Sequence, residues 1–341
     1  MGTALIDHIV HLLREHGVRE VILTLGAHAP LLIKHVESAN YGIAVRYVVE
    51  NEPLGTAGGV KNARKWLDDT FLVVSGDALT DADLSAALRF HAAHEGKVTM
   101  LLKQVENIFL YGMVVTDGEG RVRQFLEKPK SEREVVSRIA NTGMYVIDPD
   151  VLDLIPDGEF FDFARNLFPL MLERGLPLYG KLIDQYWCDV GSLGDYLRAH
   201  ADALEGKVRL PLAWRMSPKR VHAEGALVDP RAFIRAPVYI GRGARVEQNV
   251  SLGPYAVVAP GAVLRRGSFV SDSVIGPGAH VGEGAEVIHS VIAAKTLVLR
   301  QSRVVGAAVN GLRVKGLVGN ITEPLAVPEA RRRWAGRPGI A

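Results

Sequence analysis

Two aspartates stand where a metal ion could be held. Asp77 follows Gly76 just after an apolar run at residues 71–74, and Asp189 follows a predicted strand at residues 178–183. The carboxyl ends of strands in an open α/β sheet face the ligand crevice. Mg²⁺ is typically held there by one or two carboxylates and by substrate phosphates, and a glycine lets a phosphate approach closely. The pair therefore indicates a Mg²⁺ site, although each aspartate alone is equally typical of a turn or a helix cap.

A glycine-rich segment lies between a predicted strand and a predicted helix. Residues 52–59 read Glu-Pro-Leu-Gly-Thr-Ala-Gly-Gly. Small residues let a flat base lie against the backbone, where exposed amides can read its edge. By itself, the segment is equally well interpreted as a plain glycine turn.

Three polar residues farther along could bind a phosphorylated sugar. Glu127 and Lys128 precede Pro129, after a predicted strand, and Asn141 precedes another strand. A carboxylate grips sugar hydroxyls, an ammonium meets a phosphate, and an amide both donates to and accepts from a hydroxyl. A surface charge pair before a turn is the commoner interpretation of Glu127 and Lys128 when they are taken alone.

The order of these motifs resembles that of the sugar-nucleotide pyrophosphorylases. This family includes mannose-1-phosphate guanylyltransferases and glucose-1-phosphate uridylyl- and thymidylyltransferases. The chain carries Glu-Pro-Leu-Gly-Thr-Ala-Gly, Gly-Asp, Tyr-Gly, Glu-Lys-Pro, Asn-x-Gly and Trp-x-Asp-Val-Gly in that order. Each motif is moderately specific, and six in order are strongly so. The repeats that follow resemble the guanylyltransferase-like branch.

The resemblance implies a reaction and a set of roles. An NTP and a sugar 1-phosphate would react, with Mg²⁺ as cofactor, to give an NDP-sugar and pyrophosphate, mainly through positioning and charge neutralisation. Gly55, Thr56 and Ala57 would contact the nucleobase, Gly76 would lie beside the nucleotide, and Asp77 and Asp189 would hold the metal. Gly112 would face the sugar through its backbone, Glu127 and Asn141 would bind its hydroxyls, and Lys128 would bind its phosphate.

The chain departs from the family at its first residues. The family opens with a strand and a loop of the type G-x-G-T-R-L-x-P-L-T, then Pro-Lys, and residues 1–5 correspond to the point just after it. We favour a start at an internal codon over a degenerate, regulatory relative, because the later motifs are intact. In either case we expect negligible pyrophosphorylase activity from the chain as written, and unpaired edges on strands at residues 21–25 and 71–74.

The elements that must position these residues alternate between helix and strand over residues 1–205. This rhythm predicts a Rossmann-like, mostly parallel sheet with helices on both faces. A helix is expected to begin at Leu5 and to stop at Gly17. Further helices are predicted at residues 55–67, 83–94, 161–174 and 193–204, and strands at 21–25, 45–49, 71–74, 98–102, 111–115, 121–126, 143–147 and 178–183.

A different period begins after a linker at residues 206–237. From residue 238 to 310 an aliphatic residue recurs every six positions, with two slips of one residue, and a small or β-branched residue stands two positions earlier. This pattern predicts a left-handed parallel β-helix, in which one aliphatic side chain per short side points inward. Residues 311–341 form a C-terminal tail. The inward positions are Ile240, Val246, Leu252, Val258, Leu264, Val270, Ile275, Val281, Val287, Ile292, Val298 and Val304.

Composition narrows the possible partners. The 341 residues carry a net charge of +2, which argues against a nucleic-acid surface. One cysteine, Cys188, allows no intramolecular disulfide and fits the cytoplasm. No apolar stretch is long enough to span a membrane, and the first residues have no signal-peptide pattern.

Two further expectations concern the β-helix. Open ends and flat faces of such coils tend to associate, so we expect a homo-oligomer formed through residues 238–309. Hexapeptide β-helices also occur in acyltransferases, which need a catalytic histidine. His280 and His289 are the candidates, and neither lies in a convincing motif.

Overall fold

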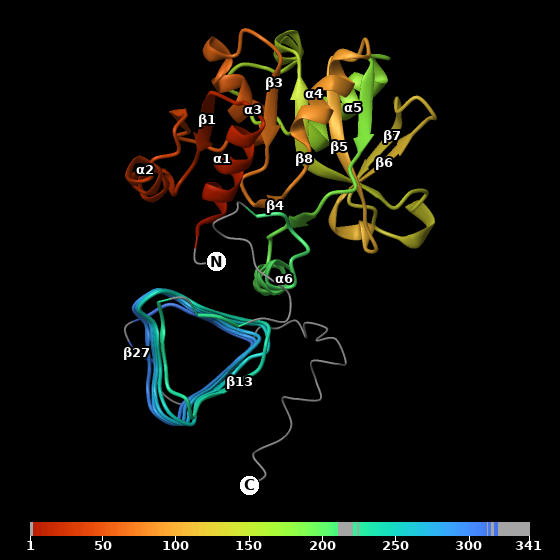
Figure 1. The fold of residues 1–341 in the computed structure, drawn as a ribbon. Coiled ribbons are helices and arrows are strands. Elements are labelled where there is room, and N and C mark those ends of the chain that lie inside the picture. The colour runs from red at the N-terminus through yellow and green to blue at the C-terminus, as the bar shows by residue number, and fades with distance from the viewer. Residues whose placement is uncertain (1–2, 211–220, 224, 312, 315–316, 320–341) are drawn as a thin grey trace. The chain divides into compact units, whose positions relative to one another are not determined.

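The computed structural model describes residues 3–210, 221–223, 225–311, 313–314 and 317–319. The chain divides into two compact units (Figure 1). One comprises Leu5–Asp189, and the other comprises Val190 onward together with the first four residues. Among the described residues, no helix is long and apolar enough to cross a membrane.

The first unit opens with two helix–strand pairs. Helix α1 (Leu5–Glu15) precedes β1 (Glu20–Leu25), and α2 (Ala29–Ser38) precedes β2 (Ala44–Val49). Strands β1 and β2 pair in parallel, as expected for a right-handed crossover through a helix. Gly17 adopts a positive φ of 83° just after α1, which confirms the predicted stop. Helix α2 was not predicted.

A six-stranded sheet forms the centre of the first unit. Its order is β7-β6-β8-β5-β9, and β3 also pairs with β8. Strand β8 runs antiparallel to β3, β5 and β6, whereas β5 and β9 are parallel. Thus β3, β5, β6 and β9 share one direction, as predicted for most of the sheet, whereas β8 and β7 run the opposite way, so that β5–β9 is the only parallel hydrogen-bonded pair among the described strands of this sheet. The strands are β3 (Phe71–Val74), β5 (Val98–Gln104), β6 (Gly112–Thr116), β7 (Val122–Glu127), β8 (Ile139–Ile147) and β9 (Leu178–Leu182).

Helices cover both faces of this sheet, as the sequence predicted. The side chains of β5 alternate, so Met100 and Leu102 pack in one core cluster and Leu101 packs in the other. The first cluster is closed by α3 (Gly55–Asn62) and by a π-helical turn (Phe163–Leu167) that continues into α5 (Phe168–Glu173). The second is closed by α1 and by α4 (Leu84–Ala92). Single-turn 3₁₀ segments lie at Arg64–Trp66, Ile108–Leu110 and Glu132–Glu134, and a longer one at Pro149–Leu154.

Strands β1 and β3, whose edges were expected to be unpaired, each have one hydrogen-bonded neighbour among the described strands. Strand β1 pairs with β2, and β3 pairs with β8. Apart from Leu25, no residue of either strand is fully buried, although both are predominantly apolar. The expected unpaired edges are therefore present.

A short antiparallel ribbon joins distant parts of the first unit. Strand β4 (Ala78–Thr80) pairs with β10 (Trp187–Asp189), so that Asp189 lies opposite Ala78. Neither three-residue strand was predicted. Asp81 extends the junction, because its carboxylate accepts a hydrogen bond from the amide of Tyr186 (2.8 Å).

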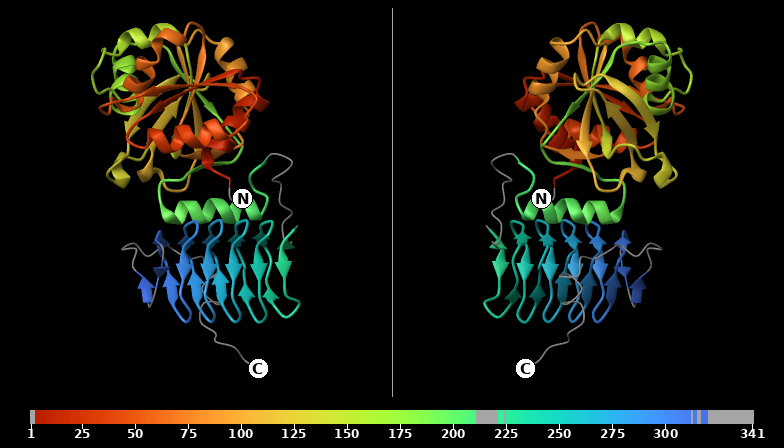
Figure 2. Two further views of the ribbon diagram at one scale, coloured as in Figure 1. Left: turned by 90° about the vertical axis from the view of Figure 1, so that its left-hand side faces the viewer. Right: turned by 90° about the vertical axis from the view of Figure 1, so that its right-hand side faces the viewer.

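The second unit is a parallel β-helix, as predicted from the six-residue period. Its strands extend from Val221 to Gly319, however, so the predicted linker (206–237) and tail (311–341) contain strands of the first and last coils. Its three sheets each contain six short parallel strands, and successive coils stack one on the next (Figure 2). The strands of the first sheet are β11 (Val221–His222), β14 (Val238–Ile240), β17 (Ala256–Val258), β20 (Val274–Ile275), β23 (Val291–Ile292) and β26 (Ala308–Val309). Those of the second are β12 (Leu227–Val228), β15 (Arg245–Val246), β18 (Val263–Leu264), β21 (His280–Val281), β24 (Leu297–Val298) and β27 (Arg313–Val314). Those of the third are β13 (Phe233–Ile234), β16 (Ser251–Leu252), β19 (Phe269–Ser271), β22 (Glu286–Ile288), β25 (Arg303–Val305) and β28 (Leu317–Gly319).

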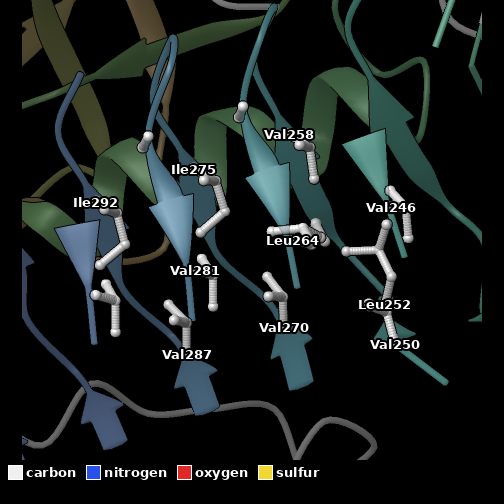
Figure 3. Close-up of a cluster of buried hydrophobic side chains, with 14 of the residues drawn as sticks. Val246, Val250, Leu252, Val258, Leu264, Val270, Ile275, Val281, Val287 and Ile292 are labelled. Carbon is white, nitrogen blue, oxygen red and sulfur yellow. The ribbon is translucent and has the colours of Figure 1, made fainter. Parts of the chain in front are cut away.

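The aliphatic side chains of each coil form the core of the β-helix. Every predicted inward position is almost fully buried in one cluster. Figure 3 shows ten residues of this cluster, including Ile275, Val281 and Val287 on the three sides of one coil. Burial of this stack is the main source of stability in an architecture where each coil contacts only its neighbours.

Helix α6 (Leu193–Leu204) belongs to the second unit. Its buried Leu197 and Leu204 pack with Val257 and Val274 on the first sheet of the β-helix. Figure 2 shows the helix lying along one side of the coils. The hydroxyl of Tyr255 donates to the carboxylate of Glu205, the C-cap residue of the helix (2.5 Å). We expected this helix to close the first domain, which was to end at residue 205, but the compact units divide between Asp189 and Val190.

Candidate active site

The β4–β10 ribbon brings the two predicted carboxylates to neighbouring positions. Asp77 directly precedes Ala78, the residue that pairs with Asp189. Asp77 is exposed and Asp189 is half-buried. The hydroxyl of Ser75 donates to Oδ1 of Asp77 (2.5 Å) and holds that carboxylate at the end of β3.

The helix-cap interpretation of Asp189 is wrong. Asp189 lies in β10, and the N-cap of α6 is Ser192, whose hydroxyl accepts from the amide of Asp195 (3.2 Å). The sequence left the two roles open because both residues stand shortly before the helix.

Two neighbouring carboxylates fit Mg²⁺ better than a metal with a full protein cage. Within the part of the chain that the structure describes, no group of three or more His, Cys, Asp or Glu side chains is arranged to hold a metal. Mg²⁺ keeps several water or phosphate ligands and needs only one or two protein carboxylates. Asp77 and Asp189 supply that number.

Strand β8 carries Asn141 to the same end of the sheet. The amide of Ser75 donates to the carbonyl of Gly143 (3.2 Å). Gly143 has a φ of 75°, and a Cβ there would lie 3.1 Å from Cβ of Ser75, so the close approach favours glycine. Asn141 accepts from the amide of Gly143 (3.1 Å) and donates to the hydroxyl of Tyr145 (2.9 Å). Its amide is thereby fixed within two residues of the contact to Ser75.

Trp187 ties the β4–β10 ribbon to β8 and to the residue before β6. Its indole N–H donates to the carbonyl of Thr142 (3.1 Å), and its ring meets that of Tyr111 edge-on with centroids 5.1 Å apart. Trp187 stands two residues before Asp189, and Tyr111 directly precedes Gly112. Aromatic packing therefore joins the Trp-x-Asp and Tyr-Gly motifs.

Gly112 and Glu127 face each other across the β6–β7 hairpin. They are paired in register, and a Cβ at Gly112 would lie 2.8 Å from Oε2 of Glu127. The carboxylate therefore occupies the space that a side chain would fill. Lys128 has a φ of 50°, and its amide donates to the carbonyl of Tyr111 (3.2 Å). A lysine held in this region is a strained position of the kind found at functional sites.

The electrostatic surroundings of Glu127 reveal two charged neighbours that the sequence did not. Burial raises the pKa of Glu127, Lys128 lowers it, the charge of Asp162 raises it and that of Arg165 lowers it, with a net upward shift. Asp162 and Arg165 were missed. Asp162 caps the π-helical turn, and an aspartate before a helix is normally interpreted as a cap and nothing more.

The glycine-rich segment lies at the start of α3, where Gly55 has a φ of 75°. The hydroxyl of Thr56 donates to Oδ2 of Asp162 (2.8 Å) and accepts from the amide of Phe163 (3.0 Å). Ala57 is buried, and its amide donates to the carbonyl of Phe161 (3.0 Å). These two groups are thus used inside the fold, so contact with a base would involve the exposed Thr56 methyl or neighbouring backbone. Gly76 lies exposed in the turn before Asp77.

The histidines considered for acyl transfer lie outside this arrangement. His280 is half-exposed on β21. His289 bonds to Asp272 through Nδ1 (2.6 Å), and its Nε2 atom is buried without a hydrogen-bond partner. A buried Nε2 offers no access for an acyl acceptor.

An α/β sheet with two carboxylates and further polar side chains near one end is typical of nucleotide-binding transferases. Residues 1–206 match the family described as "Nucleotidyl transferase", and residues 233–319 match "GMPPB C-terminal domain". This chain belongs to the nucleotidyl transferase family.

Three relatives show the breadth of the similarity. A UTP–glucose-1-phosphate uridylyltransferase from Synechocystis sp. is 31% identical over 297 residues, covering 79% of this chain and 74% of the relative. A mannose-1-phosphate guanylyltransferase from Mycobacterium tuberculosis is 35% identical over 273 residues, covering 79% and 75%. A probable mannose-1-phosphate guanylyltransferase 1 from Oryza sativa subsp. japonica is 30% identical over 285 residues, covering 80% and 77%.

Proposed function

We propose that this protein makes an NDP-sugar and pyrophosphate from an NTP and a sugar 1-phosphate. An oxygen of the sugar 1-phosphate attacks the α-phosphorus of the NTP. The bond from the α-phosphorus to the oxygen bridging to the β-phosphorus breaks, and pyrophosphate leaves with that oxygen. No protein nucleophile is required, so the work of the site is positioning and charge neutralisation.

One observation supports this proposal above the others. The β4–β10 register, the Ser75–Gly143 contact and the Trp187–Thr142 hydrogen bond gather motifs from distant parts of the chain at one end of the sheet. In the proposed site, these joined segments supply the carboxylates for a metal and the amide for a hydroxyl. A set of unrelated surface turns would show no such linkage.

The residues then have the following roles. Mg²⁺, when bound, supplies positive charge for the phosphate oxygens, and Asp77 and Asp189 hold it. Glu127 and Asn141 bind sugar hydroxyls, Lys128 neutralises the sugar phosphate, and Gly112 admits the sugar to its backbone. Gly55, Thr56, Ala57 and Gly76 line the nucleotide side.

The base and the sugar are proposed as one of two pairs. The similar proteins named above act on mannose 1-phosphate as guanylyltransferases or on glucose 1-phosphate as a uridylyltransferase. The match of residues 233–319 supports the guanylyltransferase-like alternative. We also propose a cytoplasmic homo-oligomer, supported by the single cysteine and by the open coil ends of the β-helix.

A pyrophosphate-release assay tests the proposal. The full-length protein is incubated with each NTP, with mannose or glucose 1-phosphate, and with or without Mg²⁺. Any turnover that one pair supports should be abolished by removal of Mg²⁺ and restored by its readdition. Asp77→Asn and Asp189→Asn should each lose several kcal/mol of transition-state stabilisation, about 10³-fold or more in rate, while folding normally.

The matched control is Asp184→Asn, which removes an exposed carboxylate five residues before Asp189. Near-wild-type turnover of Asp77→Asn would remove Asp77 from the site. If residues 1–341 show negligible turnover, Mg²⁺-dependent binding of NDP-sugars is compared for the same variants. Binding without turnover would favour the regulatory alternative, and absence of both would refute the proposal.

A further inference from the structure

The loop that opens α3 is fastened to the segment just before the π-helical turn. The carbonyl of Phe161 accepts from the amides of Ala57 (3.0 Å) and Gly58 (2.9 Å), and its amide donates to the carbonyl of Leu54 (2.8 Å). A Cβ at Gly55 would lie 2.7 Å from that carbonyl oxygen. The two segments are therefore in such close contact that one cannot shift without the other.

Asp162 is the charged centre of this junction. Its Oδ1 accepts from the amides of Ala164 and Arg165 (both 3.0 Å), and its Oδ2 accepts from the hydroxyl of Thr56 (2.8 Å). Thr56 in turn accepts from the amide of Phe163 (3.0 Å). A cap needs only the two amides, so the bond to Thr56 is additional to what the helix requires.

The same carboxylate faces the sugar side of the site. Asp162 lies near enough to Glu127 for its negative charge to act on that residue, as do the positive charges of Lys128 and Arg165. A second route runs through Asn141, which bonds to Tyr145, whose ring packs against Phe163 with centroids 5.0 Å apart. Both routes start at residues proposed to bind sugar hydroxyls and end at the hydroxyl of Thr56.

We propose that Asp162 is a positioning residue that couples the sugar-phosphate subsite to the nucleotide loop through Thr56. This inference rests on the proposed function, because it assigns ligands to the two sides. When a sugar hydroxyl engages Glu127 and Asn141, Asp162 and Phe163 are held in place, and the bonds to Thr56, Ala57 and Gly58 fix the loop for the nucleotide. Binding of either ligand then strengthens binding of the other by the same factor.

The first test measures the dissociation constant of the NTP by calorimetry, with and without saturating sugar 1-phosphate. Wild type should bind the NTP more tightly when the sugar phosphate is present. Loss of a hydrogen bond to a charged group should weaken NTP binding about tenfold in Thr56→Val and in Asp162→Ala, and should abolish the dependence on sugar phosphate. The double variant should be no worse than either single variant, because both remove one interaction.

Two further variants separate coupling from a merely structural role. Thr56→Ser keeps the hydroxyl and removes the methyl, so it should retain the dependence of NTP binding on sugar 1-phosphate even where its affinity for the NTP alone changes. Asp162→Asn keeps the shape and removes a negative charge beside Glu127, so the pKa of Glu127 should fall. The pH at which sugar-phosphate binding is lost on acidification should then move to a lower value. Asp157→Asn is the matched control, since it removes an exposed ion pair to Lys61 (3.3 Å) between the same two segments, away from Thr56.

Three outcomes would overturn the inference. The first is a wild-type dependence of NTP binding on sugar 1-phosphate in Asp162→Ala, and the second is additive losses of NTP affinity in the double variant. The third is a Thr56→Ser variant in which this dependence is lost as completely as in Thr56→Val. If wild type binds neither ligand, the proposed function fails first. Hydrogen exchange then tests, without any ligand, whether Asp162 holds the loop. Asp162→Ala should speed exchange at the amides of Ala57 and Gly58. Unchanged exchange there would show that Asp162 does not hold the loop.

Discussion

Glycine at position 112 leaves room for a carboxylate. A Cβ there would lie 2.8 Å from both Oε2 of Glu127 and Cζ of Phe125, too close for either to stay in place. We expect Gly112→Ala to displace Glu127 and to lower kcat/KM at least tenfold, with some loss of stability from overpacking. Gly118→Ala in the β6–β7 turn is the control, since a Cβ there meets nothing within 4 Å. Equal kinetics for the two variants would contradict the assigned role of Glu127.

Asp148 lies at the end of the central sheet away from the candidate site, and its ionisation makes the free energy of unfolding depend on pH. It accepts from Thr70 (2.7 Å), bonds to His91 (3.2 Å) and lies 3.5 Å from Nζ of Lys97. Burial acts to raise the pKa of Asp148. The hydrogen bonds from Thr70 and His91, with the charges of His91 and Lys97, outweigh burial and hold the pKa below the usual 3.8.

A depressed pKa stabilises the folded state only while the group is ionised. Asp148 should contribute fully above about pH 4 and lose its contribution as pH falls through its folded-state pKa. We expect Asp148→Asn to lower the free energy of unfolding by about 1–3 kcal/mol at pH 7, and by much less at pH 3. Urea unfolding at both pH values measures the difference. The exposed Asp150, 3.0 Å from Lys97, supplies a control variant whose effect should be small at either pH.

At the residue scale, candidate site residues could be predicted from the sequence, but the contacts between them could not. Asp77, Asp189 and Asn141 could be named because each follows or precedes an apolar strand in a recognisable motif. The bond between Thr56 and Asp162 joins positions 106 residues apart, so no local pattern could indicate it. Asp162 itself carries only the signal of a helix cap.

At the scale of elements, the longer helices and strands were predicted well from their apolar patterns, whereas the three-residue strands were not. The strand at Phe71–Val74 and the helix at Leu193–Leu204 have the predicted bounds. Strands β4 and β10 have three residues each, too few for a period to appear. The reversed direction of β8 is set by pairing with β3, β5 and β6, which depends on long connections and not on the residues of β8.

Helix α6 offers a test of which unit it stabilises. Leu204 is almost fully buried beside Val257 and Val274. We expect Leu204→Ala to cost about 2–5 kcal/mol and to raise hydrogen exchange in residues 238–309, with no change in β5. Arg198→Ala, which removes a 2.8 Å surface ion pair with Asp195, should change exchange in neither region. Faster exchange in β5 than in the β-helix would place the helix with the other unit.

At the scale of the whole molecule, the β-helix was the most predictable part. One inward aliphatic position per six residues directly reflects the geometry of a three-sided coil, so the sequence and the core coincide. The open first coil supports the proposed oligomer. Strands β12 and β13 each pair on one side only among the described strands, and they carry Leu227 and Phe233, which are 62% and 70% exposed.

We therefore predict that light scattering at micromolar concentration finds an oligomer, and that Phe233→Glu shifts it toward the monomer by placing charge on an apolar contact. Leu31→Glu alters an equally exposed apolar residue of the first unit and should leave the mass unchanged. A wild-type monomer, or an oligomer that survives removal of the β-helix, would contradict the assignment.

Because its coils stack regularly, the β-helix should tolerate the removal of one whole coil. Val274 pairs with Val291, seventeen residues later, as Val257 does with Val274. Removing residues 274–290 would join Ser273 to Val291 and place Ile292, Val298 and Val304 where Ile275, Val281 and Val287 now lie. Because each coil contacts only its neighbours, a shortened protein should fold and melt at a slightly lower temperature.

His289 leaves with the removed coil, so Asp272→Asn should accompany the deletion, because the Asp272 carboxylate would lose its bond to the imidazole. Deleting the nine residues 274–282 would shift the register of all later strands by about half a coil and should prevent folding of the β-helix. Circular dichroism would detect the loss of its β-structure. If both deletions melt alike, register between coils does not determine stability. If only the whole-coil deletion folds, the length of this region can change between relatives in steps of one coil, without any adjustment of the catalytic unit.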